Sequence, residues 1–577
     1  MRNSKSTSNE QSRTASKSLT AANKLSFRQW FRDGNPWVWL TGGAVAVSVI
    51  MTIGLIGLIA YRGLEHFWPA AVIQAQYTVP GQATETLAGE VTNKEEVPRQ
   101  RLADAGLPVA KDGPEVMTRH LLKVGNREVY PADFTWLVND WLTNITRPKD
   151  IMTIERRSNG NFYGYLEDVR ENGKVVATGD QAWGELLKRA KRANALEKKI
   201  DHLQRVEIGK LNYSLDRVRL HGRALELKGK LDDAAKQKLE ARRNELNTQI
   251  QGLEQQLSDL TVKYNRDQFK VRTADGKEEV LQVGTIVRAY HPNALSAGAK
   301  AHIYMSRLWE FLSAQPREAN TEGGVFPAIF GTVIMTLIMA VLVTPFGVIA
   351  AVYMREYAKQ GFVTKLIRIA VNNLAGVPSI VYGVFGLGFF VYVLGGSIDK
   401  IFFPESLPGP TFGTPGLLWA SLTLAILAVP VGIVSTEEGL TRIPRSLREG
   451  SLALGATKAE TLWKVVLPMA SPAMMTGLIL AVARAAGEVA PLMLVGVVKL
   501  APTLPINGSY PYLHLDQKIM HLGFHIYDVG FQSPNVEAAR PLVYATALLL
   551  ILIVALLNIS AVLIRNNLRE KYKMLDG

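Results

Sequence analysis

The sequence predicts an α-helical polytopic membrane protein that carries an inserted α+β domain. Three observations predict this class. Five or six stretches hold the roughly 20 apolar residues that a helix needs to cross a hydrocarbon core of about 30 Å. A long region between the first two stretches, residues 62–322, has the composition of a soluble domain. Lysine and arginine are concentrated in alternate connections between the stretches, as in membrane proteins of fixed orientation.

The membrane spans follow in order from the N-terminus. Residues 1–35 are predicted to be a disordered, basic cytoplasmic tail, because they are rich in Ser, Thr, Asn and Lys. Residues 36–61 are predicted to be the first transmembrane helix, because the stretch is too long for a removed signal peptide and lacks a small-residue cleavage site. The other spans are predicted near residues 326–353, 370–396, 415–434, 473–498 and 541–564.

The distribution of lysine and arginine sets the orientation of six spans. Seven basic residues precede Pro36, four lie in the loop 354–369, five lie in the loop 435–466 and four follow Ile564, whereas the loop 397–414 has one. Both termini are therefore predicted to be cytoplasmic and the inserted domain extracytoplasmic. The formal charge of +14 is then mainly a topology signal, and since no nucleic-acid motif is present we expect membrane lipid but no nucleic acid as a partner. The absence of cysteine excludes disulfides and thiolate metal sites.

The extracytoplasmic domain is predicted to contain a long helical hairpin at about residues 183–265. Two β-hairpins flank it, with turns at Asn172-Gly173 and Asp275-Gly276. The helical part has no proline, and its apolar residues recur at alternating spacings of four and three residues, at Leu246, Ile250, Leu253, Leu257 and Leu260. A break near Gly229 lets two arms of about 45 Å fold back on each other. The stripe predicts that the arms pack together, and the alternative is a docking surface for a partner.

A motif in the cytoplasmic residues 447–468 indicates a coupling role. The segment "LREGSLALGATKAETLWKVVLP" carries Glu449, the small pair Gly450-Ser451, Gly455 six residues after the glutamate, and Leu467-Pro468 at its end. The pattern predicts a short helix, a glycine break and a second amphipathic helix that ends before the proline. A helix-turn-helix at the membrane surface is suited to a groove on another protein, and the alternative is an ordinary connecting loop.

This motif resembles the coupling loop of ABC importer permeases, which reads E-A-A-x-x-x-G followed by I-x-L-P. Gly450 and Ser451 stand in place of the two alanines, and Val465 stands in place of the isoleucine. The resemblance implies the ABC importer permease fold with six spans, and a loop that docks in a separate ATPase subunit. The sequence has no G-x-x-x-x-G-K-[ST] phosphate loop of its own. The chain is therefore expected not to be an enzyme and to bind no cofactor, with ATP and Mg used by the partner ATPase.

Three further stretches resemble one family of these permeases. They read "GGVFPAIFGTVIMTLIMAVLVTPFGVIAAVYMREYA", "NNLAGVPSIVYGVFGLGFF" and "ARAAGEVAPLM". They are similar to the A-type (PstA) permeases of the bacterial phosphate ABC importer, the Pst system, with Val489 where that family usually has threonine. The resemblance covers residues 323–577, the predicted ABC permease transmembrane domain, and leaves the large extracytoplasmic domain outside it. It implies assembly with a second, C-type permease, two ATPase subunits and a periplasmic phosphate-binding protein in the bacterial inner (cytoplasmic) membrane.

Arg484 and Glu488 are the main candidates for the substrate pathway. A charged side chain at the bilayer centre costs about 3 kcal/mol on insertion scales, so it normally faces a bundle interior or an aqueous path. The guanidinium fork of Arg484 can bind a phosphate edge with two hydrogen bonds. An ionised Glu488 can accept the P–OH of phosphate and repel sulfate, which has no proton. The alternatives are a pair at i and i+4 that only neutralises itself, or a Glu488 that only orients the arginine. Gly487 and Pro491 flank the pair and favour a kink or an unwound turn.

Two further groups of polar residues are secondary candidates. Three arginines at the inner mouth are candidate anion contacts, because the resemblance implies an arginine of the anion route near this place, although the positive-inside rule also explains them; they are Arg442, Arg445 and Arg448. His521 and His525 with Asp528 have a loose metal-like spacing. A solvated loop or a contact with the binding protein fits that spacing better, so no metal site is expected.

Together these features predict a permease subunit that forms half of a phosphate path and works by alternating access. The alternatives are a permease for another oxyanion or small polar solute, and an envelope sensor or mechanical adaptor that uses the helical hairpin. The extracytoplasmic domain could dock the binding protein, brace the partner permease or reach toward the cell wall.

Overall fold

The computed structural model describes residues 32, 34–110, 113–533 and 536–573, so the predicted tail at residues 1–35 lies almost wholly outside the described residues. The chain divides into two units, residues 1–62 and 63–577. The described part of the first unit is essentially helix α3 (Asn35–Glu65), which extends into the start of the second. Because α3 is long and exposes apolar side chains on every face, it has the character of a membrane span.

Six helical stretches among the described residues are long and apolar enough to cross a membrane, in agreement with the predicted number. They are Pro36–Glu65, Phe326–Tyr357, Ser379–Phe402, Leu417–Arg442, Lys458–Gly487 and Ala539–Glu570.

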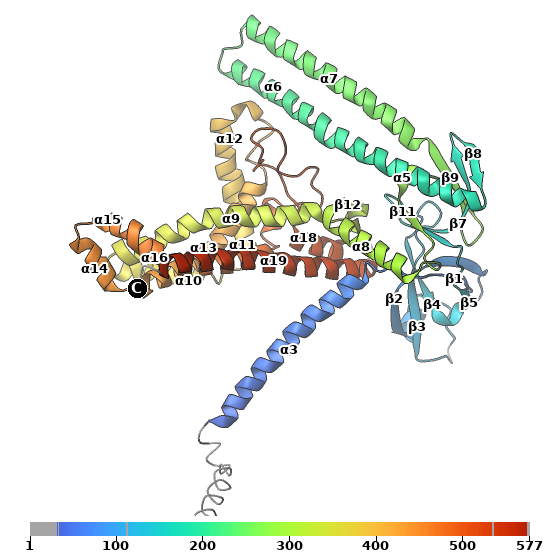
Figure 1. Cartoon of the computed structure of the whole chain (residues 1–577), viewed down its shortest axis with the longest axis horizontal. Helices are drawn as coiled ribbons and strands as arrows, with labels where there is room; N and C mark the ends of the chain where they lie inside the picture. Colours follow the sequence, from blue (N-terminus) through green and yellow to red (C-terminus); the bar gives the residue numbers. More distant parts are fainter. Residues whose placement is uncertain (1–31, 33, 111–112, 534–535, 574–577) are drawn as a thin grey trace, which may run out of the picture. The chain divides into compact units, whose positions relative to one another are not determined.

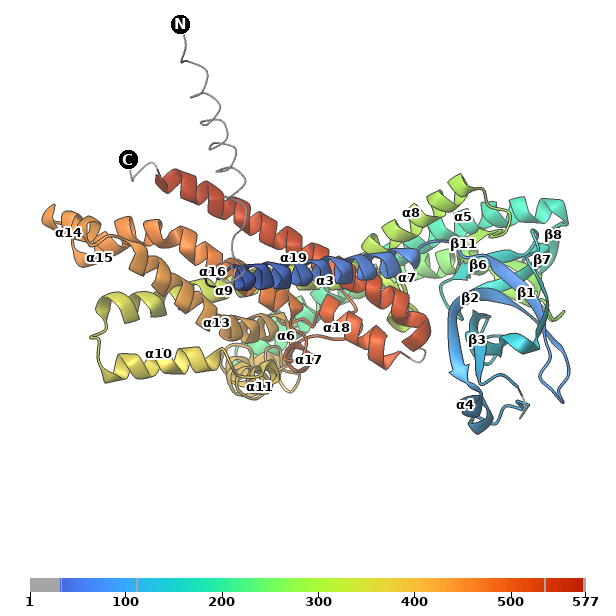
Figure 2. The same cartoon turned by 90° about the horizontal axis from the view of Figure 1, so that it is seen from below.

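Four helices of the second unit lie side by side as a bundle, as Figure 1 and Figure 2 show. They are α9 (Phe326–Val352), α13 (Leu417–Arg442), α16 (Leu467–Gly487) and α19 (Val536–Lys573). Buried side chains such as Met335, Trp419 and Ala485 fill the contact between α9, α13 and α16. The buried hydroxyls of Thr332 and Thr336 each donate to the carbonyl four residues back at 2.7 Å, so these two hydroxyls are paired within their own helix.

Two spans differ from the prediction. The third was expected to be continuous over 370–396, but α10 (Phe362–Leu374) ends before Pro378 and α11 (Ser379–Phe385) begins after it. Proline lacks an N–H donor and disfavours a helical residue before it, which accounts for the break. The helix then continues as η6 (Gly386–Gly395) and α12 (Gly396–Phe402). The fifth span was expected at 473–498, but its helix ends at Gly487.

The described residues of the inserted domain form two large antiparallel sheets, and β12 (Pro316–Arg317) pairs with β13 (Glu322–Gly323) at its end. The first has the order β4-β3-β2-β1-β5, and the second has the order β10-β9-β7-β6-β11 with β8 paired to β7. The strands are β1 (Val72–Tyr77), β2 (Glu85–Pro98), β3 (Val116–Lys123), β4 (Phe134–Val138), β5 (Leu142–Thr146), β6 (Met152–Arg156), β7 (Phe162–Glu171), β8 (Lys174–Thr178), β9 (Asp267–Arg272), β10 (Glu278–Gln282) and β11 (Ile286–Tyr290). The two predicted β-hairpins are β7–β8 and β9–β10, with their turns at Asn172-Gly173 and Asp275-Gly276. The first sheet was not predicted.

The helical hairpin is present between the two β-hairpins, and its arms lie side by side (Figure 1). The first arm consists of α5 (Asp180–His202), η2 (Leu203–Ile208) and α6 (Gly209–Leu227), and the second is α7 (Asp233–Asn265). The turn contains Gly229 at φ +63°, a conformation that residues with a Cβ rarely adopt. Asp232 caps α7 by accepting a hydrogen bond from the backbone N–H of Ala235 at 2.7 Å. Leu246 and Ile250 of the apolar stripe are buried, as expected for arms that pack on each other.

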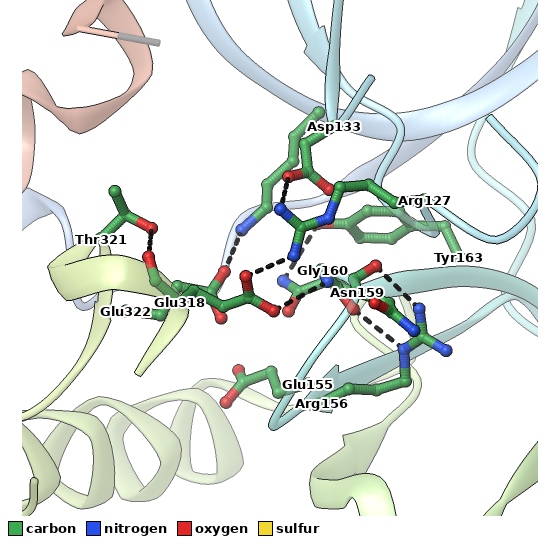
Figure 3. Close-up of polar contacts among 12 residues, drawn as sticks. Arg127, Asp133, Glu155, Arg156, Asn159, Gly160, Tyr163, Glu318, Thr321 and Glu322 are labelled. Carbon is green, nitrogen blue, oxygen red and sulfur yellow. Dashed lines mark hydrogen bonds and ion pairs between the residues drawn. The ribbon is translucent and has the colours of Figure 1, made fainter. Parts of the chain in front are cut away.

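A charged junction joins the inserted domain to the membrane bundle just before α9 (Figure 3). Glu322 forms an ion pair with Lys123 of β3 at 2.9 Å. Glu318 is ion-paired to Arg127 and accepts a hydrogen bond from the backbone N–H of Gly160 at 3.3 Å. On the other side, the Asn320 amide donates to the Lys499 carbonyl at 2.9 Å and to a carboxylate oxygen of Asp528 at 3.1 Å. The segment 318–320 therefore contacts both parts of the unit.

A second ionic cluster fixes the helix that leads into this junction, α8 (Ala297–Ser313). Arg307 of α8 donates from Nε to the buried carboxylate of Glu155 on β6 at 2.9 Å, and Arg288 is ion-paired to the same carboxylate. Burial alone would raise the pKa of Glu155, but the two guanidinium groups outweigh it and lower the pKa to about 2. The carboxylate is therefore ionised at neutral pH and holds α8 to the sheet.

Candidate functional site

Arg484 and Glu488 lie together at the end of α16. Arg484 is in the last helical turn, and Glu488 follows the last helical residue, Gly487, with extended backbone angles. The Arg484 Nε and the nearer carboxylate oxygen of Glu488 are 3.5 Å apart. The Arg484 side chain is 37% exposed and that of Glu488 is 18% exposed, so neither group is sealed between packed helices.

The predicted unwinding near Pro491 is present and lies against a second helix break. The chain leaves the helical path after Gly487, and the short helix α17 (Leu492–Val495) begins after Pro491. A Cβ built on Gly383 of α11 would lie 2.6 Å from the Pro491 Cα, so the two segments are in close backbone contact. Tyr382, one residue earlier, donates its hydroxyl to the Leu374 carbonyl at 2.6 Å and so bridges the break between α10 and α11. The two interrupted spans therefore meet beside Arg484.

A groove of about 600 Å³ runs along α10. Its lining includes Lys365, Arg368 and Asn372, which share one helix face at spacings of three and four residues. Arg368 forms an ion pair with Glu437 of α13 at 2.5 Å. Sequence reasoning missed these residues because it counted the two cations only as topology charges in a loop. The signal that could have found them is the continuation of the polar stripe to Asn372, inside a stretch that was predicted as a span.

The predicted coupling segment folds as a helix-turn-helix. Helix α14 (Arg445–Ala453) contains Glu449, Gly450 and Ser451, and Gly455 follows it at φ +87°. A capping box formed by Thr457 and Glu460 starts α15 (Lys458–Thr461). Ser451 and Thr461 are within hydrogen-bond distance through their hydroxyls at 2.9 Å, which ties the two helices together.

The prediction that the second helix ends before Pro468 is wrong. The helix passes through η8 (Leu462–Val466), a wider π-helical turn, and continues through Leu467 and Pro468 into α16. Pro468 has no N–H to donate to the preceding turn, and the wider π-helical turn directly before it accompanies this missing bond while the chain stays helical. The coupling segment is therefore continuous with the helix that carries Arg484.

The outer surface of the coupling segment exposes apolar side chains. Leu454 is 91% exposed and Trp463 is 72% exposed. Isolated apolar residues are common on protein surfaces, but two large ones on a compact turn are typical of an interaction surface.

The three candidate arginines at the inner mouth have different environments. Arg448 forms an ion pair with Glu356 at 3.1 Å and donates to the Leu440 carbonyl at 2.7 Å, so it holds the coupling segment to neighbouring helices. Arg442 and Arg445 are exposed. Arg448 thus has a structural role that explains its position without an anion.

His521 and His525 are buried, contrary to the predicted solvated loop. His521 caps α18 (Leu522–Tyr527), its Nδ1 accepting from the backbone N–H of Gly523 at 3.1 Å. Neither ring nitrogen of His525 has a hydrogen-bond partner among the described residues. Asp528 is instead ion-paired to Lys499 at 3.2 Å. No group of three metal-ligating side chains occurs in the described part of the chain.

Acidification is expected to loosen the segment around α18. Burial lowers the pKa of both His521 and His525 to about 4, from an ordinary value of 6.5. An opened segment therefore takes up protons between pH 6.5 and 4, and stability that is full above pH 6.5 falls by about 1.4 kcal/mol per pH unit for each histidine. Amide hydrogen exchange of residues 519–532, corrected for intrinsic rates, should speed up between pH 7.5 and 5. In His525→Gln the pH dependence should be about halved, and unchanged protection at pH 5 in the native chain would contradict the prediction.

Comparison with known proteins places the chain in a family. The family of binding-protein-dependent transport system inner membrane components matches residues 343–573. The phosphate transport system permease protein PstA 1 of Mycobacterium tuberculosis is 35% identical over 245 residues, which cover 42% of this chain and 70% of the relative. The PstA protein of Yersinia pestis is 32% identical over 252 residues, covering 44% and 75%. Among solved structures, the inward-facing MetNI methionine ABC transporter is 20% identical, with a TM-score of 0.31, and covers 42% of this chain and 94% of that one.

The inserted domain lies outside the residues that the family matches, whereas most of the bundle, the coupling segment and the Arg484–Glu488 pair lie within them. The sequence identity over most of the relative's length and the six helices able to cross a membrane both indicate a membrane permease. The chain belongs to the PstA family of phosphate transport system permeases, within the membrane components of binding-protein-dependent ABC transporters.

Proposed function

We propose that this chain forms one half of the translocation path of an ATP-driven importer for inorganic phosphate. The observation that carries the proposal is the position of Arg484, a partly exposed guanidinium at the end of an interrupted membrane helix. Ionisable groups inside membrane spans are costly and mark substrate paths. Phosphate offers the planar pair of oxygens that an arginine fork binds best.

The path continues from Arg484 to the cytoplasmic side along α10. Arg484, Asn372, Arg368 and Lys365 offer hydrogen-bond donors to an anion, and the two helix breaks supply backbone that is free of helical bonding. Arg368 is paired with Glu437 at 2.5 Å, more closely than Arg484 is paired with Glu488 at 3.5 Å, so it would hold an anion less tightly than Arg484 does. A weaker second contact favours release, because conduction needs binding that is easily reversed.

The energy is supplied by a partner. The segment 447–468 docks in the groove of a separate ATPase subunit, with Leu454 and Trp463 as its apolar contacts. The complete importer contains a second, C-type permease, two ATPase subunits and a periplasmic phosphate-binding protein. This chain binds no cofactor, and ATP and Mg act on the partner ATPase. Both termini lie in the cytoplasm of a bacterium and residues 62–322 lie in the periplasm.

The experiment that tests the proposal is reconstitution of the complex. The chain is purified with its co-purifying partners, placed in vesicles with ATP inside, and supplied outside with ³²P-phosphate and the binding protein. ATP-dependent uptake of phosphate is expected. Uptake of a different oxyanion in preference to phosphate would change the substrate, and the absence of any solute flux would favour a sensor or mechanical adaptor.

Replacement of Glu488 tests how phosphate is distinguished from sulfate. If Glu488 accepts the P–OH of phosphate, sulfate leaves it unpaired, so the native importer rejects sulfate. Glu488→Gln can donate to sulfate, and we expect sulfate to compete at least about tenfold more strongly, since one unsatisfied buried group costs about 1–3 kcal/mol. The measurement is phosphate uptake against increasing sulfate. Unchanged rejection would leave Glu488 only the task of orienting Arg484.

A further inference from the structure

The helical hairpin touches a loop of the membrane domain through the half of its first arm that is nearer the turn. The Tyr213 hydroxyl of α6 donates to the backbone carbonyl of Tyr510, 297 residues away in sequence, at 2.9 Å. Arg217, one turn further on, donates to the same carbonyl at 3.4 Å and lies 5.8 Å from the Tyr510 ring. The Tyr213 ring meets the buried His514 edge-on at 5.4 Å, and α6 also packs on residues 404–406. We call the contact of Tyr213 and Arg217 with Tyr510 the clasp.

The hairpin is rooted far more firmly than the clasp holds it. At the root, Leu186 and Ala190 of α5 are buried against the second sheet, and Arg189 is ion-paired to the buried Asp267 at 2.6 Å. The two hydrogen bonds of the clasp are exposed to solvent, where water competes for both partners. A broad apolar interface would make a permanent brace, whereas a few exposed polar contacts can open and close.

The loop held by the clasp is bonded to the chain that follows the candidate anion site. The Leu515 carbonyl accepts from the backbone N–H of Leu418 at the start of α13, at 2.8 Å. The Ile519 N–H donates to the Gly496 carbonyl at 3.0 Å. Gly496 lies directly after α17, and therefore just beyond the unwound residues 488–491. A movement of the loop is thus passed through backbone hydrogen bonds to the segment beside Arg484.

The junction before α9 provides the second attachment of the inserted domain. It combines ion pairs with three successive residues in the left-handed region, Glu318, Ala319 and Asn320, at φ +46°, +53° and +77°. Non-glycine residues in that region are held there by their surroundings, and such segments are common at switch regions. The domain is therefore fixed at one end and lightly clasped at the other.

We propose that the hairpin is a reversible clasp on the outer loops of the permease. In the state seen here α6 holds the loop 505–519, and the clasp must open when the transport cycle moves that loop. The position of the hairpin and the state of the site at Arg484 are then coupled. The uptake measurement below rests on the proposed phosphate transport, whereas the exchange measurement does not.

The first test locks the clasp. Since the chain has no cysteine, Arg217→Cys with Tyr510→Cys gives a unique pair for a short, reducible thiol cross-linker. In the reconstituted importer, cross-linking should slow phosphate uptake at least about tenfold, and reduction should restore it, because a locked state cannot complete the cycle. The matched control is Gly222→Cys with Leu239→Cys, which joins the two arms of the hairpin to each other: a Cβ built on Gly222 would lie 3.4 Å from the Leu239 side chain. Cross-linking the control should leave uptake unchanged.

Two outcomes of this test would overturn the proposal while phosphate transport stands. If the two cysteines at positions 217 and 510 cross-link fully and uptake is not slowed, the hairpin is a static brace. If they never cross-link, the contact does not form in the assembled importer.

The second test needs no transport. Tyr213→Phe with Arg217→Gln removes the hydroxyl and the guanidinium that donate in the clasp but keeps the aromatic ring and the helix. Amide hydrogen exchange in residues 505–519 of the assembled complex should then be at least about tenfold faster, because local opening is no longer opposed by the clasp. The control Arg219→Gln changes a cation of the same helix that is paired with Asp216 at 2.8 Å. Equal exchange in all three proteins would overturn the proposal, even in an importer that proves to carry another solute.

Discussion

Arg484→Ala is expected to reduce phosphate uptake at least about 100-fold, because two charge-assisted hydrogen bonds to phosphate are lost, together worth about 3 kcal/mol or more. The variant chain should still reach the membrane, since removing a charge from a span lowers the cost of insertion by about 3 kcal/mol. The measurement is the initial rate of ³²P-phosphate uptake, normalised to the amount of assembled complex. Arg484→Lys, which keeps the charge but loses the planar fork, should give an intermediate rate.

The double variant Arg484→Ala with Glu488→Gln separates the two interpretations of the pair. If the ion pair only neutralises itself, the single variant fails because it leaves Glu488 unpaired, and removal of both charges should restore uptake. If Arg484 binds the anion, the double variant should be as slow as the single one. Recovery of uptake would therefore show that Arg484 does not bind the anion, and the family assignment, which does not depend on Arg484, would stand.

The local features of the membrane domain could be predicted from the sequence because they are encoded by neighbouring residues. The six apolar stretches, the helix-turn-helix with Gly455 and the unwound turn at Pro491 all depend on residues within a few positions of one another. The limits of the helices were less predictable. The sequence alone does not show that the helix continues past Pro468 after the π-helical turn η8. A proline is found both just after the end of a helix and in the first turn of one, so its presence does not decide between the two.

The helical hairpin was predictable for the same reason, and the first sheet was not. The apolar stripe that begins at Leu246 has a strict spacing of four and three residues, and an isolated helix would expose that stripe to water. In contrast, β2 (Glu85–Pro98) contains a charged run with little alternation, and its burial comes from the strands on either side of it. Strand pairing of this kind is decided by distant residues.

The contacts that decide the site also come from distant parts of the chain. His525 is buried by the packing of α18 against α9 and α19, which a local polar sequence does not reveal. The stripe from Lys365 to Asn372 lines a groove on α10, and its Arg368 is ion-paired to Glu437 of α13, a contact that a local sequence does not reveal. The clasp joins residues almost 300 positions apart. Sequence patterns gave the candidate residues Arg484 and Glu488, but their relation to the second helix break required the fold.

Leu454→Glu is expected to uncouple the permease from its ATPase. Leu454 is 91% exposed at the tip of the coupling segment, so the change removes no internal contact and should leave folding and membrane insertion intact. If the side chain enters an apolar groove of the ATPase, a carboxylate there costs about 2 kcal/mol or more, as for a central interface residue. Retention of the ATPase during purification and ATP-dependent uptake should both fall at least about 30-fold. Leu454→Met, which keeps the apolar character and volume, should retain both.

Helix α15 runs without interruption into the helix that carries Arg484. A change at Leu454 that stops phosphate flux without altering the anion site would therefore show that the motion of the ATPase reaches the path through α16. Normal ATPase retention and uptake in Leu454→Glu would instead place the docking contact elsewhere on the cytoplasmic face.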